Sequence, residues 1–157
     1  SLINVLDEIS MPTIWLWPNI DAGSDSISKT IRIFREHNKA EWLYLIKNLK
    51  PEVFQKLLKK TSCAIGNSSS FVRDTTFTGT PVVLCGDRQS FRESGPNLIS
   101  TSFEQDEIKK NILSQLNHGR YKPNNLYGDG KASAQIVNIL KSTDLKVEKN
   151  INYLNNL

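Results

Sequence analysis

The sequence predicts an α/β domain of the Rossmann type, built on a doubly wound and mostly parallel sheet. Short runs rich in Val, Ile, Leu and Trp alternate along the chain with longer segments of helical character. These runs are continuously apolar, which is typical of parallel strands covered by helices on both faces of a sheet. The length of 157 residues, with 38% hydrophobic and 23% charged residues, fits one globular domain and excludes a disordered chain.

Each element follows from a local pattern. The segment SLINVLDEIS (1–10) is typical of the end of a helix, so we expect the chain to be a piece of a longer protein. Compact apolar runs predict strands at 13–17, 42–46, 63–66, 81–85 and 97–100. The longer segments predict helices at 25–37, 51–60, 69–78, 104–117 and about 131–142. We expect a single domain over 1–157, with its core at about 11–142 and a helix or tail at 143–157.

Turn and cap residues separate these elements. Pro18 ends the first strand, Gly23 permits a turn, and Ser24 or Asp25 can cap the helix that follows. The Gly-Thr-Pro segment at 79–81 separates a helix from the fourth strand. In each case the residue type interrupts one regular structure where the next begins.

Charge and composition exclude several function classes. The net charge is +4, but the basic residues are scattered, and the main cluster of Lys56, Lys59 and Lys60 falls on a predicted helix. No aromatic interleaving or nucleic-acid-binding motif accompanies this charge, so we expect no nucleic-acid partner. A mild positive excess suits a ligand that carries phosphate. Neither a signal peptide nor an apolar run of membrane length is visible, so we expect no membrane association.

Two cysteines, Cys63 and Cys85, fall in predicted core strands, where a free thiol behaves as a small apolar group. A disulfide between them is open if the two strands are neighbours. The context favours reduced thiols and a cytoplasmic protein.

Ligands of open parallel sheets bind beyond the carboxyl ends of the strands. After the first strand, Asn19 and Asp21 place two short polar groups at this edge, where they can meet a sugar or a base. The same segment also reads as a plain loop with a helix cap. Nothing local decides between the two interpretations.

The segment GNSSS (66–70) follows the third strand. Gly66 allows a tight turn, and three serines then offer hydroxyls and backbone N–H groups at a helix start. The N–H groups and the helix dipole favour an anion there, with Arg73 and Asp74 on the first turns. One serine suffices for capping, so both a helix cap and a phosphate site remain open.

The loop GDRQSFRESG (86–95) follows the fourth strand and carries Arg88 and Arg92, which can reach over the same edge. His37 and His118 fall near helix C-termini and away from the strand ends, which indicates structural or surface roles. No metal-binding spacing, nucleophile elbow, phosphate-loop fingerprint or acid/base pair is present at the strand ends. We therefore expect no metal and no cofactor, and a binding half whose catalytic residues lie elsewhere.

Three motifs in fixed order, WPNIDAGS, CAIGNSSSFVRDTTFTGTPVVLCGDRQSFRESGPN and YGDGKAS, resemble the C-terminal half of UDP-N-acetylglucosamine 2-epimerases. The resemblance covers about 11–142 and is closer to the hydrolysing, sialic-acid-pathway type. The non-hydrolysing type carries Asp-Ser-Gly-Gly and Glu-Glu where this chain has Asn67 to Ser70 and Arg73-Asp74.

This resemblance implies the glycosyltransferase-B architecture, in which two Rossmann-like domains face across a cleft and UDP lies mainly on the C-terminal one. It implies that Ser68, Ser69 and Arg88 contact the phosphates. Asp74 stands where the family has a Glu that grips the ribose hydroxyls, and it is one methylene shorter. The matching positions also place Asn19 at the nucleotide edge and Leu49 where backbone groups contact uracil. Further substrate contacts would come from Asp21, Asn67, Arg73, Arg92 and Glu93.

The reaction implied by the resemblance begins with proton abstraction at C2 of the sugar and anti-elimination of UDP. Water then adds to the 2-acetamidoglucal, which releases N-acetylmannosamine and UDP. The acting carboxylates belong to an N-terminal domain, so we assign no catalytic residue to this chain and expect it to be inactive alone. Its expected partners are UDP-N-acetylglucosamine or a related UDP-2-acetamido sugar and that N-terminal domain, with a homo-oligomer left open.

Three other interpretations stay open at this point. The chain could be the donor-binding half of a glycosyltransferase of the same architecture, although its DRQ…RE loop favours the epimerase. It could be a non-catalytic UDP-sugar-binding or interaction module. It could also be a Rossmann-like domain without a ligand.

Overall fold

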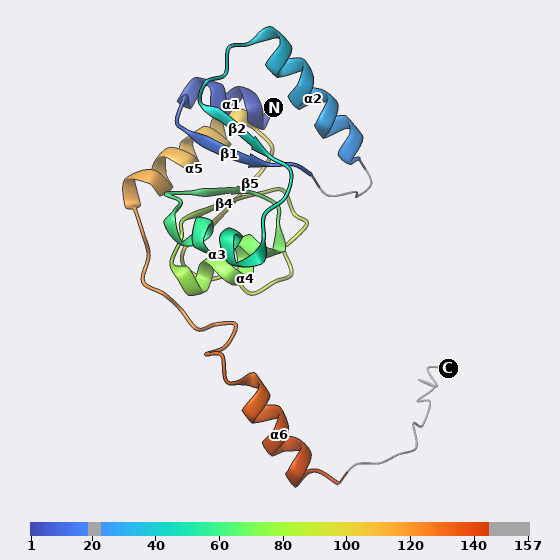
Figure 1. Ribbon diagram of the computed structural model, residues 1–157. Helices are drawn as coiled ribbons and strands as arrows, with labels where there is room; N and C mark the ends of the chain where they lie inside the picture. Colours follow the sequence, from blue (N-terminus) through green and yellow to red (C-terminus); the bar gives the residue numbers. More distant parts are fainter. Residues whose placement is uncertain (19–22, 145–157) are drawn as a thin grey trace, which may run out of the picture. The chain divides into compact units, whose positions relative to one another are not determined.

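The computed structural model describes residues 1–18 and 23–144 of the chain (Figure 1). The chain divides into two compact units, Ser1–Leu126 and Tyr127–Leu157. The first unit contains the strands and all helices but the last. The second contains α6 (Ala132–Ser142), and just before this helix the Asp129 carboxylate accepts a hydrogen bond of 3.0 Å from the Lys131 N–H.

The first unit alternates helices and strands along the chain. Its helices are α1 (Leu2–Ile9), α2 (Ser24–His37), α3 (Pro51–Lys60), α4 (Ser69–Thr78) and α5 (Gln105–His118). Its strands are β1 (Thr13–Leu16), β2 (Leu43–Ile46), β3 (Ala64–Gly66), β4 (Val82–Cys85) and β5 (Leu98–Thr101). Every strand and helix that the sequence predicted up to residue 142 is present, and the bounds differ by at most one residue. The predicted helix or tail at 143–157 lies outside the described residues from position 145 on.

All strand pairs are parallel, which confirms the predicted fold class. Strand β1 pairs with β2, with Thr13 opposite Leu43. Strand β4 lies between β3 and β5 in a separate hydrogen-bonded group. The hydrogen bonds of the described strands therefore form a two-stranded and a three-stranded sheet, where the sequence suggested one. Strand β3 has only three residues, and its ladder runs to β4.

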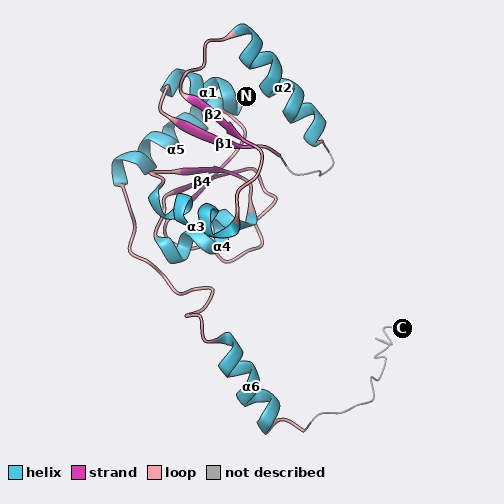
Figure 2. Cartoon of the chain, in the orientation of Figure 1, coloured by secondary structure: helices cyan, strands magenta, loops and turns pink. Residues whose placement is uncertain are grey.

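Helices cover both faces of the three-stranded sheet. Because side chains alternate along a strand, Val83 and Cys85 of β4 point to one face, and Val82 and Leu84 point to the other. The first pair packs in a cluster with apolar residues of α1, β2 and α5. The second pair packs with residues of α3 and α4. Figure 2 shows these helix pairs on opposite sides of the strands. This burial on both faces explains why the strand sequences are continuously apolar.

The start of α2 differs by one residue from the sequence prediction. Its N-cap is Gly23, with a φ of 86°, and not Ser24 or Asp25. A positive φ is strained for residues with a Cβ, so glycine suits this position better than a polar cap would.

Both cysteines are free thiols, and the register explains why. Ala64 pairs with Val82, so Cys63 lies at the amino end of the β3–β4 ladder, whereas Cys85 ends β4. The strands are neighbours, but the two thiols sit at opposite ends. Burial raises the pKa of the Cys63 thiol to about 12 and also raises the pKa of Cys85.

The segment after α5 makes hydrogen bonds to the main chain near the amino ends of β3 and β4. The Tyr121 N–H donates to the Gly79 carbonyl at 2.8 Å, and the Arg120 guanidinium donates to the Thr61 carbonyl at 2.9 Å. Gln115 lies beneath this segment, fully buried, and donates to the carbonyls of Val82 and Asn97. The bonds from Tyr121 and Arg120 satisfy main-chain carbonyls that a loop would otherwise leave unpaired, whereas the Asn97 carbonyl also accepts the Val82 N–H. None of the described helices combines the length and apolar character needed to cross a membrane.

Candidate functional site

The carboxyl ends of β3, β4 and β5 lie at one edge of the three-stranded sheet. In the ladder, Gly66 stands opposite Leu84, and Cys85 stands opposite Thr101. The segment after β3 and the long loop after β4 therefore begin side by side. This is the edge at which open parallel sheets bind ligands.

Helix α4 begins at this edge with Ser68 as its N-cap. The Ser68 Oγ accepts a long hydrogen bond of 3.3 Å from the Ser70 N–H. Gly66, with a φ of 143°, lies where an added Cβ would come within 3.3 Å of the Phe71 ring. In the described part of the chain, the N–H groups of Ser68 and Ser69 make no hydrogen bond. Unpaired N–H groups at a helix start, reinforced by the helix dipole, form an anion site.

The loop 86–95 folds back over the edge through short turns. The Gly86 N–H donates to the Thr101 carbonyl at 2.9 Å, which ties the start of the loop to β5. An added Cβ on Gly86, whose φ is 78°, would lie 2.6 Å from the Phe103 ring. Arg88, Arg92 and Glu93, which the sequence singled out, are exposed on this loop.

Gln89 connects the two segments, although no pattern in the sequence singles it out. Its neighbours in the loop are exposed, but only 7% of Gln89 is exposed. Its Nε2 donates to the Asn67 carbonyl at 3.2 Å, and its Oε1 is buried without a partner in the described part of the chain. A glutamine beside two arginines looks like surface in a sequence. Only the closeness of the two loops makes it an interior residue.

Arg73 and Asp74 leave the first turns of α4 in different directions. Arg73 is exposed, and its Nη2 lies 3.5 Å from the Ser69 Oγ. Asp74 is half-buried, and its Oδ2 accepts a hydrogen bond of 3.0 Å from Gln55 of α3. The Asp74 carboxylate therefore lies between α4 and α3, and it retains room to accept further bonds.

The remaining predicted residues belong to the segments after β1 and β2. Leu49 follows β2 and is half-buried, and its N–H donates to the Asn48 Oδ1 at 2.9 Å. That bond occupies the N–H group of Leu49. Asn19 and Asp21 lie outside the described residues.

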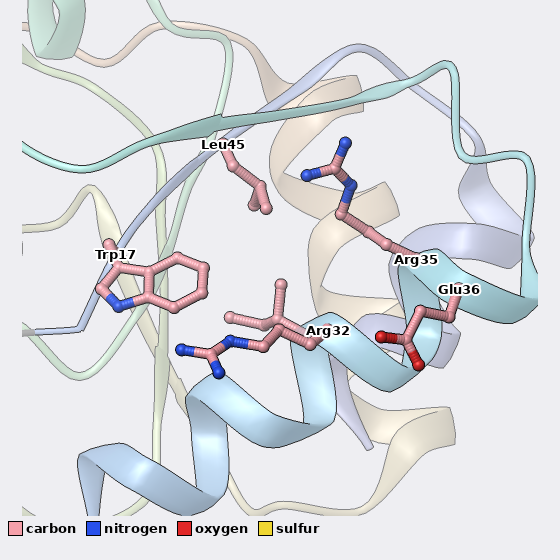
Figure 3. Close-up of a pocket in the computed structure, with 6 residues that line it drawn as sticks. Trp17, Arg32, Arg35, Glu36 and Leu45 are labelled. Carbon is pink, nitrogen blue, oxygen red and sulfur yellow. The ribbon is translucent and has the colours of Figure 1, made fainter.

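A separate hollow of about 350 Å³ lies between α2 and the two-stranded sheet (Figure 3). Arg32 places its guanidinium carbon 5.9 Å from the centre of the Trp17 ring in this hollow. The lining residues are Trp17, Ile31, Arg32, Arg35, Glu36 and Leu45. None of them is a predicted site residue, and none of these lining residues stands at the start of a helix. The chemistry of anion binding therefore favours the edge at α4 over this hollow.

The described residues contain no candidate metal site. No three His, Cys, Asp or Glu side chains of residues 1–18 and 23–144 are grouped to hold a metal ion. The arrangement at the α4 edge is instead suited to hold a multiply charged anion beside hydroxyl-bearing groups.

Comparison with known proteins identifies the family of this chain and several relatives. The family described as UDP-N-acetylglucosamine 2-epimerase matches residues 1–141 of the chain. The hydrolysing UDP-N,N′-diacetylbacillosamine 2-epimerase of Legionella pneumophila is 31% identical over 145 residues, which are 92% of this chain and 38% of that protein. The UDP-N-acetylglucosamine 2-epimerase of Neisseria meningitidis serogroup B is 26% identical, with 90% of this chain and 38% of that protein covered.

A solved structure shares the fold. The UDP-N-acetylglucosamine 2-epimerase of Methanocaldococcus jannaschii, in complex with UDP-N-acetylglucosamine and UDP, superimposes with a TM-score of 0.65 at 16% identity. The match covers 90% of this chain and 39% of that one. The chain thus spans less than half of the length of the proteins it matches. The family match over most of the chain is decisive: this chain belongs to the UDP-N-acetylglucosamine 2-epimerase family.

Proposed function

We propose that this chain is the nucleotide-binding half of a hydrolysing UDP-N-acetylglucosamine 2-epimerase and that it holds the UDP leaving group. One observation carries the proposal. Helix α4 of this chain begins at the carboxyl edge of a parallel sheet, and its first two backbone N–H groups have no partner in the described part of the chain. The chain belongs to a family named for a UDP-sugar epimerase, so a diphosphate is the anion expected there. The solved relative's complex with UDP-N-acetylglucosamine and UDP supports the choice of ligand.

The residues at this edge take distinct roles in the proposal. Ser68, Ser69 and the start of α4 hold the diphosphate, and Arg88 adds a cation. Asp74 accepts hydrogen bonds from the ribose hydroxyls, since its carboxylate has unused acceptor capacity beside Gln55. The nucleotide contacts at Asn19 and Leu49, and the substrate contacts at Asp21, Asn67, Arg73, Arg92 and Glu93, complete the assignment.

In this proposal the chain contributes to the reaction by stabilising negative charge on the leaving diphosphate. When the bond between the sugar and UDP breaks, negative charge grows on the diphosphate. Fixed N–H groups and a cation at that point lower the barrier, because they are oriented before the charge develops. Proton abstraction at C2 requires a base, which we assign to an N-terminal domain. The 157-residue chain then binds UDP but does not turn over the sugar nucleotide.

We also propose a reaction type, its products and a cellular compartment. The hydrolysing reaction would release UDP and an N-acetylmannosamine-type sugar, as in the first step of sialic-acid synthesis. The name of the Legionella relative supports the hydrolysing type. The two free thiols, one buried and one half-buried, suit a reducing compartment, so we place the protein in the cytoplasm.

Calorimetric titration of the chain tests the binding role. We expect saturable binding of UDP and of UDP-N-acetylglucosamine, with uridine much weaker because it lacks the diphosphate. A flat titration at millimolar UDP would refute the proposal. In a second assay, the chain alone should release no UDP from UDP-N-acetylglucosamine. The same chain joined to its N-terminal domain should release UDP and free N-acetylmannosamine, a product that a glycosyltransferase would not give.

A further inference from the structure

Gln89 is an interior side chain in a loop whose other residues between 87 and 94 are exposed. Only 7% of it is exposed, while Arg88 and Ser90 on either side are exposed. Its Nε2 reaches across to the segment after β3 and donates to the Asn67 carbonyl at 3.2 Å. The bond joins residues 22 positions apart, so it fixes one loop of the edge against the other.

The position of this bond matters because of peptide geometry. The peptide between Asn67 and Ser68 is planar and trans, so its C=O and N–H groups point in opposite directions. By holding the Asn67 carbonyl, Gln89 therefore also sets the direction of the Ser68 N–H. That N–H is one of the two unpaired donors at the start of α4.

The local alternatives for fixing this peptide are weak. The Ser68 cap bond to the Ser70 N–H is long, at 3.3 Å, and it lies on the helix side of Ser68. The Gln89 Oε1 remains buried without a partner within the described residues. A buried amide with one half unsatisfied contributes little to stability, since a buried oxygen without a donor keeps its desolvation cost. A positional role explains the residue better than a stabilising one.

We propose that Gln89 is a positioning residue for the diphosphate, which orients the Asn67–Ser68 peptide so that the first N–H groups of α4 face the ligand. Gln89 has this role only if the chain binds UDP as proposed above. It touches no reacting atom. It acts through the loop that it holds, and its effect is specific to the phosphates and absent for the base and ribose.

The test compares two buried glutamines that both donate to main-chain carbonyls. Gln89→Met keeps the side-chain volume and removes the donor, and Gln89→Glu replaces the donor with an acceptor that repels the Asn67 carbonyl. Gln115→Met is the matched control, since Gln115 bonds to Val82 and Asn97 at the amino end of β4. Kd values for UDP and for uridine are measured for each variant by NMR titration below its unfolding temperature. The backbone amide chemical shifts of Ser68 and Ser69 are followed without ligand.

We expect Gln89→Met to raise the Kd for UDP about fivefold to tenfold, the size of one lost hydrogen bond, and to leave the Kd for uridine within about twofold. The Gln89→Glu effect should be larger, and the backbone amide chemical shifts of Ser68 and Ser69 should change in both variants, because the Asn67–Ser68 peptide is no longer held. Gln115→Met should lower the unfolding temperature and leave the UDP-to-uridine ratio unchanged.

Equal losses for UDP and uridine in Gln89→Met, or no loss for either, would overturn the role. A change of the ratio in Gln115→Met as large as that in Gln89→Met would also overturn it, because general destabilisation would then be sufficient. If the wild-type chain does not bind UDP, the proposed function fails and this role fails with it. Normal UDP binding by the wild type with an unchanged Gln89→Met removes the role of Gln89 alone.

Discussion

Replacing Asp74 by Ala should weaken UDP binding by about tenfold to a hundredfold. The Asp74 carboxylate accepts one hydrogen bond, from Gln55 at 3.0 Å, in the described part of the chain, and so has capacity for the ribose hydroxyls. A hydrogen bond to a charged group contributes about 1.5–3 kcal/mol, which corresponds to about ten- to 150-fold in Kd. The half-buried position places the expected loss in the lower part of this range.

The fold should tolerate this change. The only bond that Asp74→Ala removes in the described structure goes to an exposed glutamine, and such bonds contribute about 0.5 kcal/mol or less. For a chain of this length we expect a fall in the unfolding temperature of about 1–2 °C. A loss of UDP affinity cannot then be attributed to unfolding.

The assay pairs the variant with a modified ligand. Calorimetric Kd values are measured for UDP and for 2′,3′-dideoxy-UDP with the wild type and with Asp74→Ala. If Asp74 holds the ribose hydroxyls, the variant should lose affinity for UDP but bind the dideoxy ligand as the wild type does. Asp74→Glu, whose side chain is one methylene longer, should bind UDP at least as tightly. Equal losses for both ligands would refute the ribose contact, and Gln55→Ala serves as the control, with an expected change within about threefold.

Further predictions concern the serine cap, the Cys63 thiol and a tight turn. Ser68→Ala should lower the unfolding temperature by only about 1–4 °C, because the cap bond that it removes is long. The same change should lower the affinity for UDP several-fold, as measured by calorimetry. At pH 8 a thiol with a pKa of about 12 is only about one ten-thousandth thiolate, so iodoacetamide should label Cys63 about a thousand times more slowly in the native chain than after unfolding, as followed by mass spectrometry. Because unfolding returns the thiol pKa to its ordinary value of 9.0, stability should also fall as pH rises from about 9 to 12. Gly79→Ala would bring a Cβ within 2.0 Å of the Tyr121 carbonyl oxygen at a φ of 66°, so thermal unfolding should show a loss of more than about 2 kcal/mol.

The sequence predicted the elements well because each one is bounded by a strong local signal. The run TIWLW stops at Pro18, and α4 stops at Gly79, whose φ of 66° forms its C-cap. Such signals depend on a few neighbouring residues, so they can be interpreted without the fold. The family was predicted for a different reason, since the order and spacing of three motifs carry more information than any one of them.

Contacts between distant residues could not be predicted in this way. Gln55 and Asp74 are 19 residues apart, and nothing in either segment indicates that the helices place them together. The burial of Gln89 likewise depends on how closely two loops approach. The free thiols depend on register, since a shift along the ladder, which no local pattern fixes, would change which residues face each other.

The two buried glutamines indicate how the domain divides stability from binding along β4. At the amino end, Gln115 is fully engaged: its Nε2 donates to Val82 and Asn97, and its Oε1 accepts from the Tyr121 hydroxyl at 2.8 Å. At the carboxyl end, Gln89 is engaged through only one of its two polar groups in the described structure. Full satisfaction rigidifies a buried polar group and the core around it, whereas a partly satisfied group contributes less to stability. Substitution of Gln115 should therefore mainly lower the free energy of unfolding, and substitution of Gln89 should mainly lower the affinity for the diphosphate.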